Sequence, residues 1–128
     1  MKVPYPTIND SLAVNSHMYI CHMVNGGIYE FVKCQTLKPY MLKNNVLRHY
    51  LDEAADITRN PFLRTTRIDC DKAFITYNTI YNDKLKTTAR PDVSEDVFID
   101  MEDELQADGY LIVKVQEDEL RVLNSLIQ

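Results

Sequence analysis

The feature that most constrains the fold is a turn signal between two β-type runs. Asn25-Gly26-Gly27 stands between residues 18–24 and 28–36, and both runs are rich in Tyr, Ile, Val and Phe. Asn and Gly tolerate the positive φ that a tight hairpin turn requires. The sequence therefore predicts an antiparallel β-hairpin. Both faces of this hairpin are fairly apolar, which is typical of strands inside a closed sheet or barrel.

The register of the hairpin decides which side chains meet at its open end. A loop of the two glycines would set His17 opposite Thr36, whereas a loop that starts one residue earlier would set it opposite Cys34. In either register, His17 and Thr36 share one end of the hairpin. This end is the first candidate for a polar functional cluster.

The length and composition fit one globular domain. The chain has 128 residues, of which 45% are hydrophobic and 26% charged. That size is enough to bury a core without metal or disulfide cross-links. We therefore expect a single domain over residues 1–128, of the α+β class.

The cysteines and the apolar runs indicate in which cellular compartment the protein is expected. Three cysteines without C-x-x-C spacing indicate neither a disulfide framework nor a zinc site. No signal-peptide pattern opens the chain, and no apolar run approaches the ~20 residues that cross a bilayer. We expect a cytoplasmic protein without a membrane segment.

Beyond the hairpin, runs of β type and helical type alternate along the chain. Either Asp92 or Ser94 could cap the next helix, and Ser94 is the better N-cap, because the two residues that follow it are acidic and suit the first turn. Phe98, Met101 and Leu105 then form an apolar stripe, and Asp108-Gly109 ends the helix. The expected elements are a short helix in 44–54, β-type runs at 65–70 and 73–77, a polar connection at 78–92, a helix at 95–107, a strand at 110–115 and a helix at 117–127.

The charge is unevenly distributed along the chain. The net charge is -5, and 11 of the 19 acidic residues follow residue 90, whereas 12 of the 14 basic residues precede residue 91. A broad basic surface for general nucleic-acid binding is therefore excluded, although a local basic groove is compatible with the composition. The asymmetry predicts a basic functional face and an acidic scaffold or partner face; a merely solvated acidic surface is the alternative.

The open end of the hairpin carries the candidate catalytic residues, His17 and Thr36. Lys33 and Lys38 lie close in sequence and are candidate RNA-binding residues. A histidine exchanges protons near neutral pH, and a hydroxyl with a cation can hold a phosphate. This combination suits metal-independent RNA cleavage, in which the 2′-hydroxyl of the substrate attacks. The alternative is a solvated strand end, with Thr36 only a β-former.

Two arginines form a second candidate RNA contact. Arg64 and Arg67 flank two threonines, and guanidinium forks match phosphate oxygens; a plain surface strand is the alternative. Asp69 and Asp71 are too unspecific to indicate a metal site, and no nucleotide-binding or common hydrolase motif occurs. We therefore expect no metal and no cofactor.

The other two histidines have simpler interpretations. His22 lies inside a predicted strand and is interpreted as structural. His49 follows Arg48 in a possible helix, where we expect an exposed pair.

Three segments of the chain resemble the PemK/MazF-like toxins, taken in order over about residues 12–77. The segments are Ser16-His17-Met18-Tyr19-Ile20, Val32-Lys33-Cys34-Gln35-Thr36 and Arg67-Ile68-Asp69-Cys70-Asp71. They stand where that family has its Arg-Pro strand, its Thr-ending strand and a later strand. Thr36 matches the family pattern directly, whereas His17 stands in place of the catalytic arginine.

The resemblance implies a small compact antiparallel β-barrel with short helices, including C-terminal helices. It also implies a type II toxin-antitoxin endoribonuclease that cleaves single-stranded RNA, forms a homodimer and is neutralised by a cognate antitoxin protein. The acidic segment of that antitoxin would occupy the groove.

The competing hypothesis is a non-enzymatic, acidic interaction protein, such as a phage-borne or immunity-type inhibitor that binds a basic partner. A structural component of a larger assembly is a third. An enzyme needs His17, Thr36 and a cation such as Lys38 or Arg67 in one groove, whereas an inhibitor does not.

Overall fold

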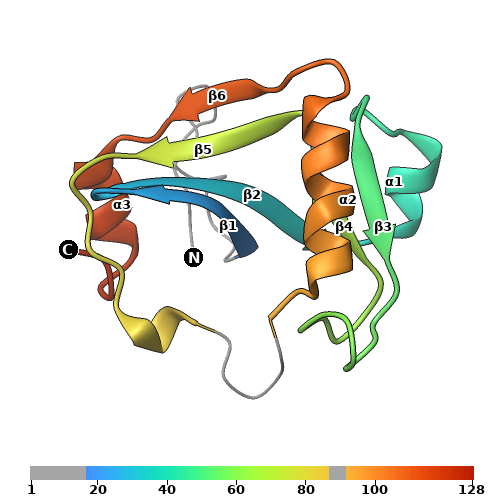
Figure 1. Ribbon diagram of the computed structural model, residues 1–128, viewed down its shortest axis with the longest axis horizontal. Coiled ribbons are helices and arrows are strands. Elements are labelled where there is room, and N and C mark those ends of the chain that lie inside the picture. Colours follow the sequence, from blue (N-terminus) through green and yellow to red (C-terminus); the bar gives the residue numbers. More distant parts are fainter. Residues whose placement is uncertain (1–16, 87–91) are drawn as a thin grey trace.

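The fold is α+β, with a six-stranded mixed sheet and three short α-helices, in the residues 17–86 and 92–128 that the computed structural model describes (Figure 1). The elements follow in the order β1 (Met18–Asn25), β2 (Ile28–Thr36), α1 (Pro39–Lys43), β3 (Tyr50–Glu53), β4 (Thr66–Asp69), β5 (Lys72–Thr76), the 3₁₀ turn η1 (Asp83–Leu85), α2 (Glu95–Gln106), β6 (Leu111–Lys114) and α3 (Glu117–Leu123).

The predicted hairpin is confirmed as β1 and β2, with a loop of two glycines. Gly26 and Gly27 adopt φ values of 55° and 88°, in the left-handed region that favours glycine. A β-bulge between Cys21 and Met23 then shifts the register by one residue, so that Met18 pairs with Cys34. In this register His17 lies opposite Gln35. Both predicted registers, which set His17 opposite Thr36 or Cys34, are therefore wrong.

Strand β2 is the centre of the sheet. Its one edge pairs with β1, and its other edge is shared by β4 and β5, which run in the same direction. The chain leaves the sheet between these two strands at Asp71. The carboxylate of Asp71 there accepts hydrogen bonds from the backbone N–H groups of Arg48 and His49, both at 2.9 Å.

The expected closed antiparallel barrel is wrong. The strand order is β3-β4-β2-β5-β6, and β6 runs parallel to β5. Strand β3 pairs with β4, and β6 pairs with β5, so β3 and β6 are the two ends of this order. They do not pair with each other, and the sheet is therefore open. Helix α2, rather than further strands, covers the apolar side: Val97, Met101 and Leu105 are fully buried against the side chains of β1, β2 and β4.

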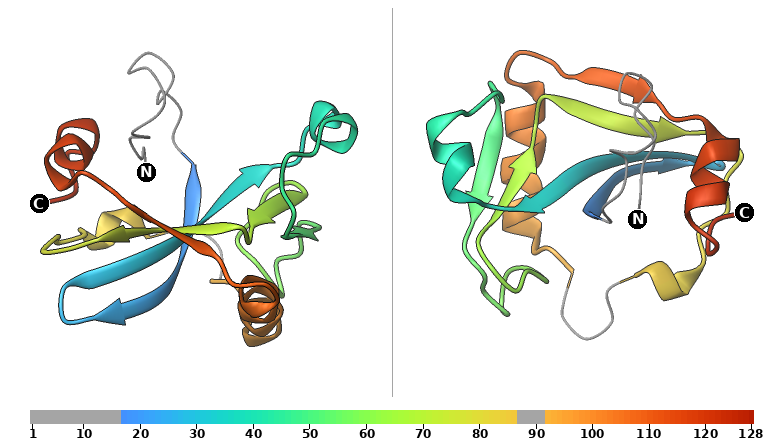
Figure 2. Two further views of the ribbon diagram at one scale, coloured as in Figure 1. Left: turned by 90° about the horizontal axis from the view of Figure 1, so that it is seen from above. Right: turned by 180° about the vertical axis from the view of Figure 1, so that it is seen from behind.

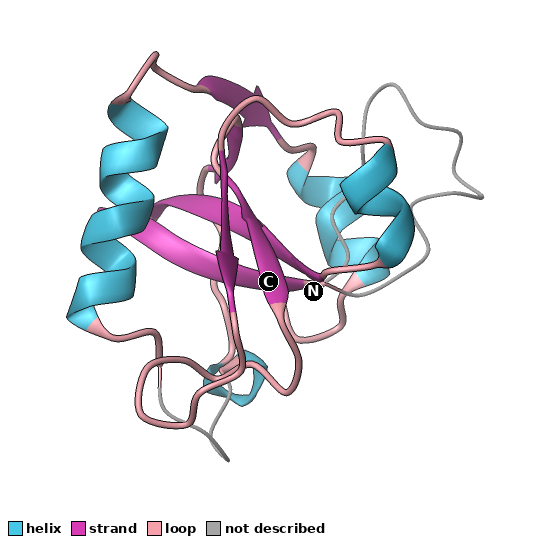
Figure 3. Ribbon diagram, turned by 90° about the vertical axis from the view of Figure 1, so that its right-hand side faces the viewer, coloured by secondary structure: helices cyan, strands magenta, loops and turns pink. Residues whose placement is uncertain are grey.

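The helices lie on opposite faces of the sheet. Helix α2 covers one face, and α1 and α3 lie on the other (Figures 2 and 3). On the α3 side, Leu120 and Ile127 pack with Phe74 and Val115. Side chains alternate along each strand, so neighbouring residues of β2 reach these two different environments.

The helix beginning at Glu95 is confirmed, and Ser94 caps it by accepting a hydrogen bond from the N–H of Val97 at 3.4 Å. Its buried stripe includes Val97, whereas the predicted Phe98 is only partly buried. The strand predicted at 110–115 is confirmed as β6. The helix predicted at 117–127 is shorter, and ends at Leu123.

The helix predicted in 44–54 is wrong. The helix α1, with Pro39 in its first turn, ends at Lys43 before this segment, and Tyr50–Glu53 form the strand β3. The apolar residues of 44–54 are compatible with either structure, and pairing of β3 along β4 decides between them.

Candidate functional site

The candidate site is a cavity of about 210 Å³ between α1 and the sheet. The sheet contributes charged and polar side chains, and the segment from α1 onward contributes amide and apolar ones. The lining residues are Lys33, Gln35, Arg67, Asp69 and Lys72 from the sheet, and Tyr40, Met41, Asn44, Asn45, Val46 and Leu47 from α1 and the loop after it.

One carboxylate of the cavity, that of Asp69, pairs with Lys72 and acts electrostatically on Lys33. Lys72 Nζ lies 3.3 Å from Asp69 Oδ2. Burial lowers the pKa of Lys33, and the charge of Lys72 lowers it further, against a smaller opposing effect of Asp69. The two ammonium groups are therefore near enough to repel each other, and an anion bound between them would relieve this repulsion.

Arg67 forms a wall of the cavity. Its guanidinium group binds Asp52 through Nε and Nη2, with both distances 2.8 Å, and lies 3.9 Å from the ring centroid of Tyr50. The side chain is only 4% exposed, and the Asp52 carboxylate raises its pKa. Arg67 therefore braces the strands, and its predicted contact with RNA stays a prediction.

His17 lies on the same face as Lys33. Burial lowers the pKa of His17, and the charge of Lys33 lowers it further. The imidazole is thus biased toward its neutral form beside a cationic cavity. In this form it can accept a proton.

Thr36 is on the other side of β2. It lies two residues after Cys34, which is buried in the core under α2, so strand alternation directs Thr36 toward that face. Thr36, Lys38 and Arg64 are all exposed and do not line the cavity. His17 does not line the cavity either, although the charge of Lys33 acts on its ring. The convergence of His17, Thr36 and a cation in one groove, which the enzyme hypothesis expects, is therefore not found among the described residues.

Sequence reasoning missed Lys72 and Asp69 as members of the site. Strand alternation alone predicts that Lys72 lies on the same face as Phe74, and Asp69 on the same face as Arg67. Whether that face is also the face of Lys33 depends on how β4 and β5 pair with β2. No local motif contains this information. The strand pairing was the missing signal.

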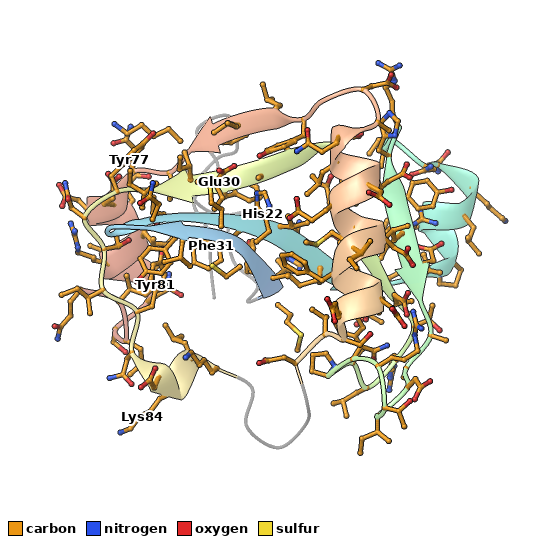
Figure 4. All side chains as sticks on the ribbon, in the orientation of Figure 1. His22, Glu30, Phe31, Tyr77, Tyr81 and Lys84 are labelled. Atoms are coloured by element: carbon orange, nitrogen blue, oxygen red, sulfur yellow. The ribbon has the colours of Figure 1, made fainter. Side chains whose placement is uncertain are left out.

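His22 is the extra residue of the β1 bulge, and its side chain points toward α2 (Figure 4). Its Nδ1 lies 2.6 Å from Glu102 of α2, and its Nε2 lies 3.4 Å from Glu30. Tyr110 also donates a hydrogen bond to Glu30, at 3.1 Å. His22 is 5% exposed, so this buried group supports its structural interpretation.

The described residues contain neither a candidate metal site nor a helix that could span a membrane. Residues 17–86 and 92–128 contain no group of three or more His, Cys, Asp or Glu side chains arranged to hold a metal ion. No helix within the same ranges has the length and apolar character needed to span a membrane.

Comparison with known proteins gives no relative: no family model matches the chain, and neither the curated proteins nor the solved structures include a significant match.

Proposed function

We propose that this chain is a metal-independent endoribonuclease of the toxin type, with its active centre at the mouth of the α1 cavity. The observation that supports this proposal is the presence of His17, Lys33 and Lys72 on one face of the sheet. Cleavage of RNA by its own 2′-hydroxyl requires a proton acceptor and positive charge at the phosphate, and Lys33 is the lysine whose charge acts on His17.

The reaction uses His17 as the base. The neutral imidazole takes the proton of the 2′-hydroxyl, and the 2′-oxygen forms a bond to phosphorus as the bond to the 5′-oxygen breaks. Lys33, whose pKa is lowered by burial and by Lys72, donates the proton to the leaving 5′-oxygen. Lys72 stays charged and stabilises the phosphorane. The products are a 2′,3′-cyclic phosphate and a 5′-hydroxyl.

This assignment defines a pH profile. His17 must be neutral, so cleavage rises with pH through a pKa below the ordinary histidine value of about 6.5. Lys33 must be protonated, so cleavage falls as the pH rises through a pKa below the ordinary lysine value of about 10.4. The profile of kcat/KM is therefore bell-shaped.

The test is expression of the chain alone in a bacterial host, followed by primer extension on total RNA. We expect growth arrest and discrete new 5′ ends, both lost in His17→Ala and kept in the control Lys84→Ala, because Lys84 is exposed in η1 and does not line the cavity. Thr36→Ala reports whether Thr36 belongs to the same centre: equal loss would place it there. Full activity of His17→Ala would overturn the mechanism.

An acidic binding protein is the second candidate. Asp96, Asp100 and Asp103 are exposed along α2, and this helix contains no basic residue. Such a face is complementary to a basic partner. Normal growth with intact RNA would favour this function.

In the ribonuclease proposal, by contrast, a cognate antitoxin and single-stranded RNA compete for the cavity, and the active form is a homodimer.

A further inference from the structure

A second group of charges, partly exposed, lies around His49. This histidine precedes β3, and its ring reaches the C-terminal end of α2. Nδ1 lies 2.9 Å from Glu104, and Nε2 lies 2.9 Å from Asp108. The ring is 17% exposed, so His49 is neither helical nor an exposed partner of Arg48, as the sequence predicts.

The hydrogen-bond pattern requires a proton on each ring nitrogen. A carboxylate only accepts hydrogen bonds, and a neutral imidazole has one donor and one acceptor. Both 2.9 Å contacts are therefore hydrogen bonds only when His49 is an imidazolium. Loss of one proton would turn one of these contacts into a repulsion between lone pairs.

The backbone of His49 is anchored to the sheet. Its N–H donates to Asp71 at 2.9 Å, and its carbonyl accepts from the N–H of Cys70 at 3.0 Å. The ring therefore has a fixed position, and α2 is the element that docks against it.

The end of α2 lacks other cationic support. The last turn of the helix contains no basic residue, although a helix C-terminus favours positive charge. Within the described residues, neither Glu104 nor Asp108 has a lysine or arginine as an ion-pair partner. The imidazolium is thus the cation that offsets two carboxylates and the negative end of the helix.

We propose that His49 is a proton-operated latch, which holds the C-terminal end of α2 on the sheet at lower pH and releases it as the pH rises. The charged groups around the ring are Glu104 and Asp108 from the α2 side, Asp71 from the β4–β5 connection, and Arg48 as the chain neighbour. Three of these four are acidic.

The direction of the effect follows from linkage. The hydrogen bond with Glu104, followed by the contacts with Asp108, raises the pKa of His49 above its ordinary value. A raised pKa in the folded state means that the stabilisation is complete below about pH 6.5 and is lost as the pH rises through the raised value. The released segment leads through Tyr110 into β6.

The test combines NMR titration of the histidine rings with amide exchange, measured on the full chain. His49 is identified by the disappearance of its signal in His49→Gln. We expect its midpoint above about 6.5, and a roughly three- to tenfold loss of protection for amides 103–108 as the pH rises through that midpoint. Protection factors, which correct for intrinsic exchange, should stay constant for the core of β2.

Two variants separate the latch from a merely structural role. In His49→Gln, the protection of amides 103–108 should be low and independent of pH. In Glu104→Gln combined with Asp108→Asn, the midpoint of His49 should return toward its ordinary value, which tests the proposal even if His49→Gln does not fold. An unshifted midpoint in the wild-type chain, or equal pH dependence in His49→Gln, would overturn the latch.

Discussion

The two faces of the central sheet contrast in chemistry although the same strands build them. Along β2, Val32 and Cys34 are buried beneath α2, whereas Lys33 and Gln35 line the cavity under α1. One face is closed by apolar packing, and the other holds lysines near enough to depress a pKa. At this end of β2, the period of two of a β-strand thus separates residues that pack in the core from residues that line the cavity.

This separation has an energetic reason. Two neighbouring ammonium groups that are partly withdrawn from water cost stability, and such groups are common at functional sites. Burial of apolar side chains under α2 offsets that cost. Removal of residues from the α2 face should therefore affect folding, and removal of lysines from the cavity face should affect function.

The largest effect on stability is expected from Met101→Ala. Met101 is fully buried under α2, and its truncation leaves a cavity in the core. We expect the free energy of unfolding to fall by about 2–5 kcal/mol, measured by urea denaturation. Ile99→Ala is the matched control on the same helix, because Ile99 is 48% exposed. Equal losses in the two variants would contradict the assignment of the buried face of α2.

An intermediate loss of stability is expected from Arg67→Ala. Arg67 is an exception to the contrast between the two faces, because it lines the cavity and also links β4 to β3. The variant loses the paired hydrogen bonds to Asp52 and the stacking on Tyr50. We expect a loss of about 1–3 kcal/mol in the free energy of unfolding. Arg64→Ala, at an exposed position, should change it by less than about 0.5 kcal/mol. An unchanged free energy of unfolding in Arg67→Ala would show that these contacts add no net stability.

The smallest effect on stability is expected from Lys33→Gln, which sharpens the comparison. Its removal relieves repulsion with Lys72, so we expect a change of less than about 1 kcal/mol in the free energy of unfolding. Cleavage of RNA should nevertheless fall by about 100-fold or more, because the proton donor is lost. Lys84→Gln, at an exposed position outside the cavity, should keep both properties. A strongly destabilised, fully active Lys33→Gln would place Lys33 among the structural residues.

Local signals were sufficient for two elements. The Asn25-Gly26-Gly27 turn predicts the hairpin, and Ser94 followed by acidic residues predicts the start of α2, because turn and capping preferences depend only on near neighbours. The helix predicted in 44–54 is wrong because its structure depends on distant residues and not on near neighbours. Its own pattern is weak, and β3 forms there because β4 offers a partner.

The candidate site was predicted in part. His17 and Lys33 were both named from the sequence, and the structure places them on one face. Thr36 was grouped with them by its position at the strand end, but strand alternation separates it. The bulge at His22 changes the register of β1 by one residue, and no residue type near it signals this change.

The sequence by itself determined the α+β class, the hairpin, the capped helix and the alternation of side chains along β2, since all of these follow from local backbone preferences and periodicity. Only the tertiary structure decided that the sheet is open, that Lys72 lies near Lys33, and that His22 and His49 contact carboxylates of α2. Contacts such as His49 with Asp108 join residues far apart in the chain, and they exist only after the strands have paired.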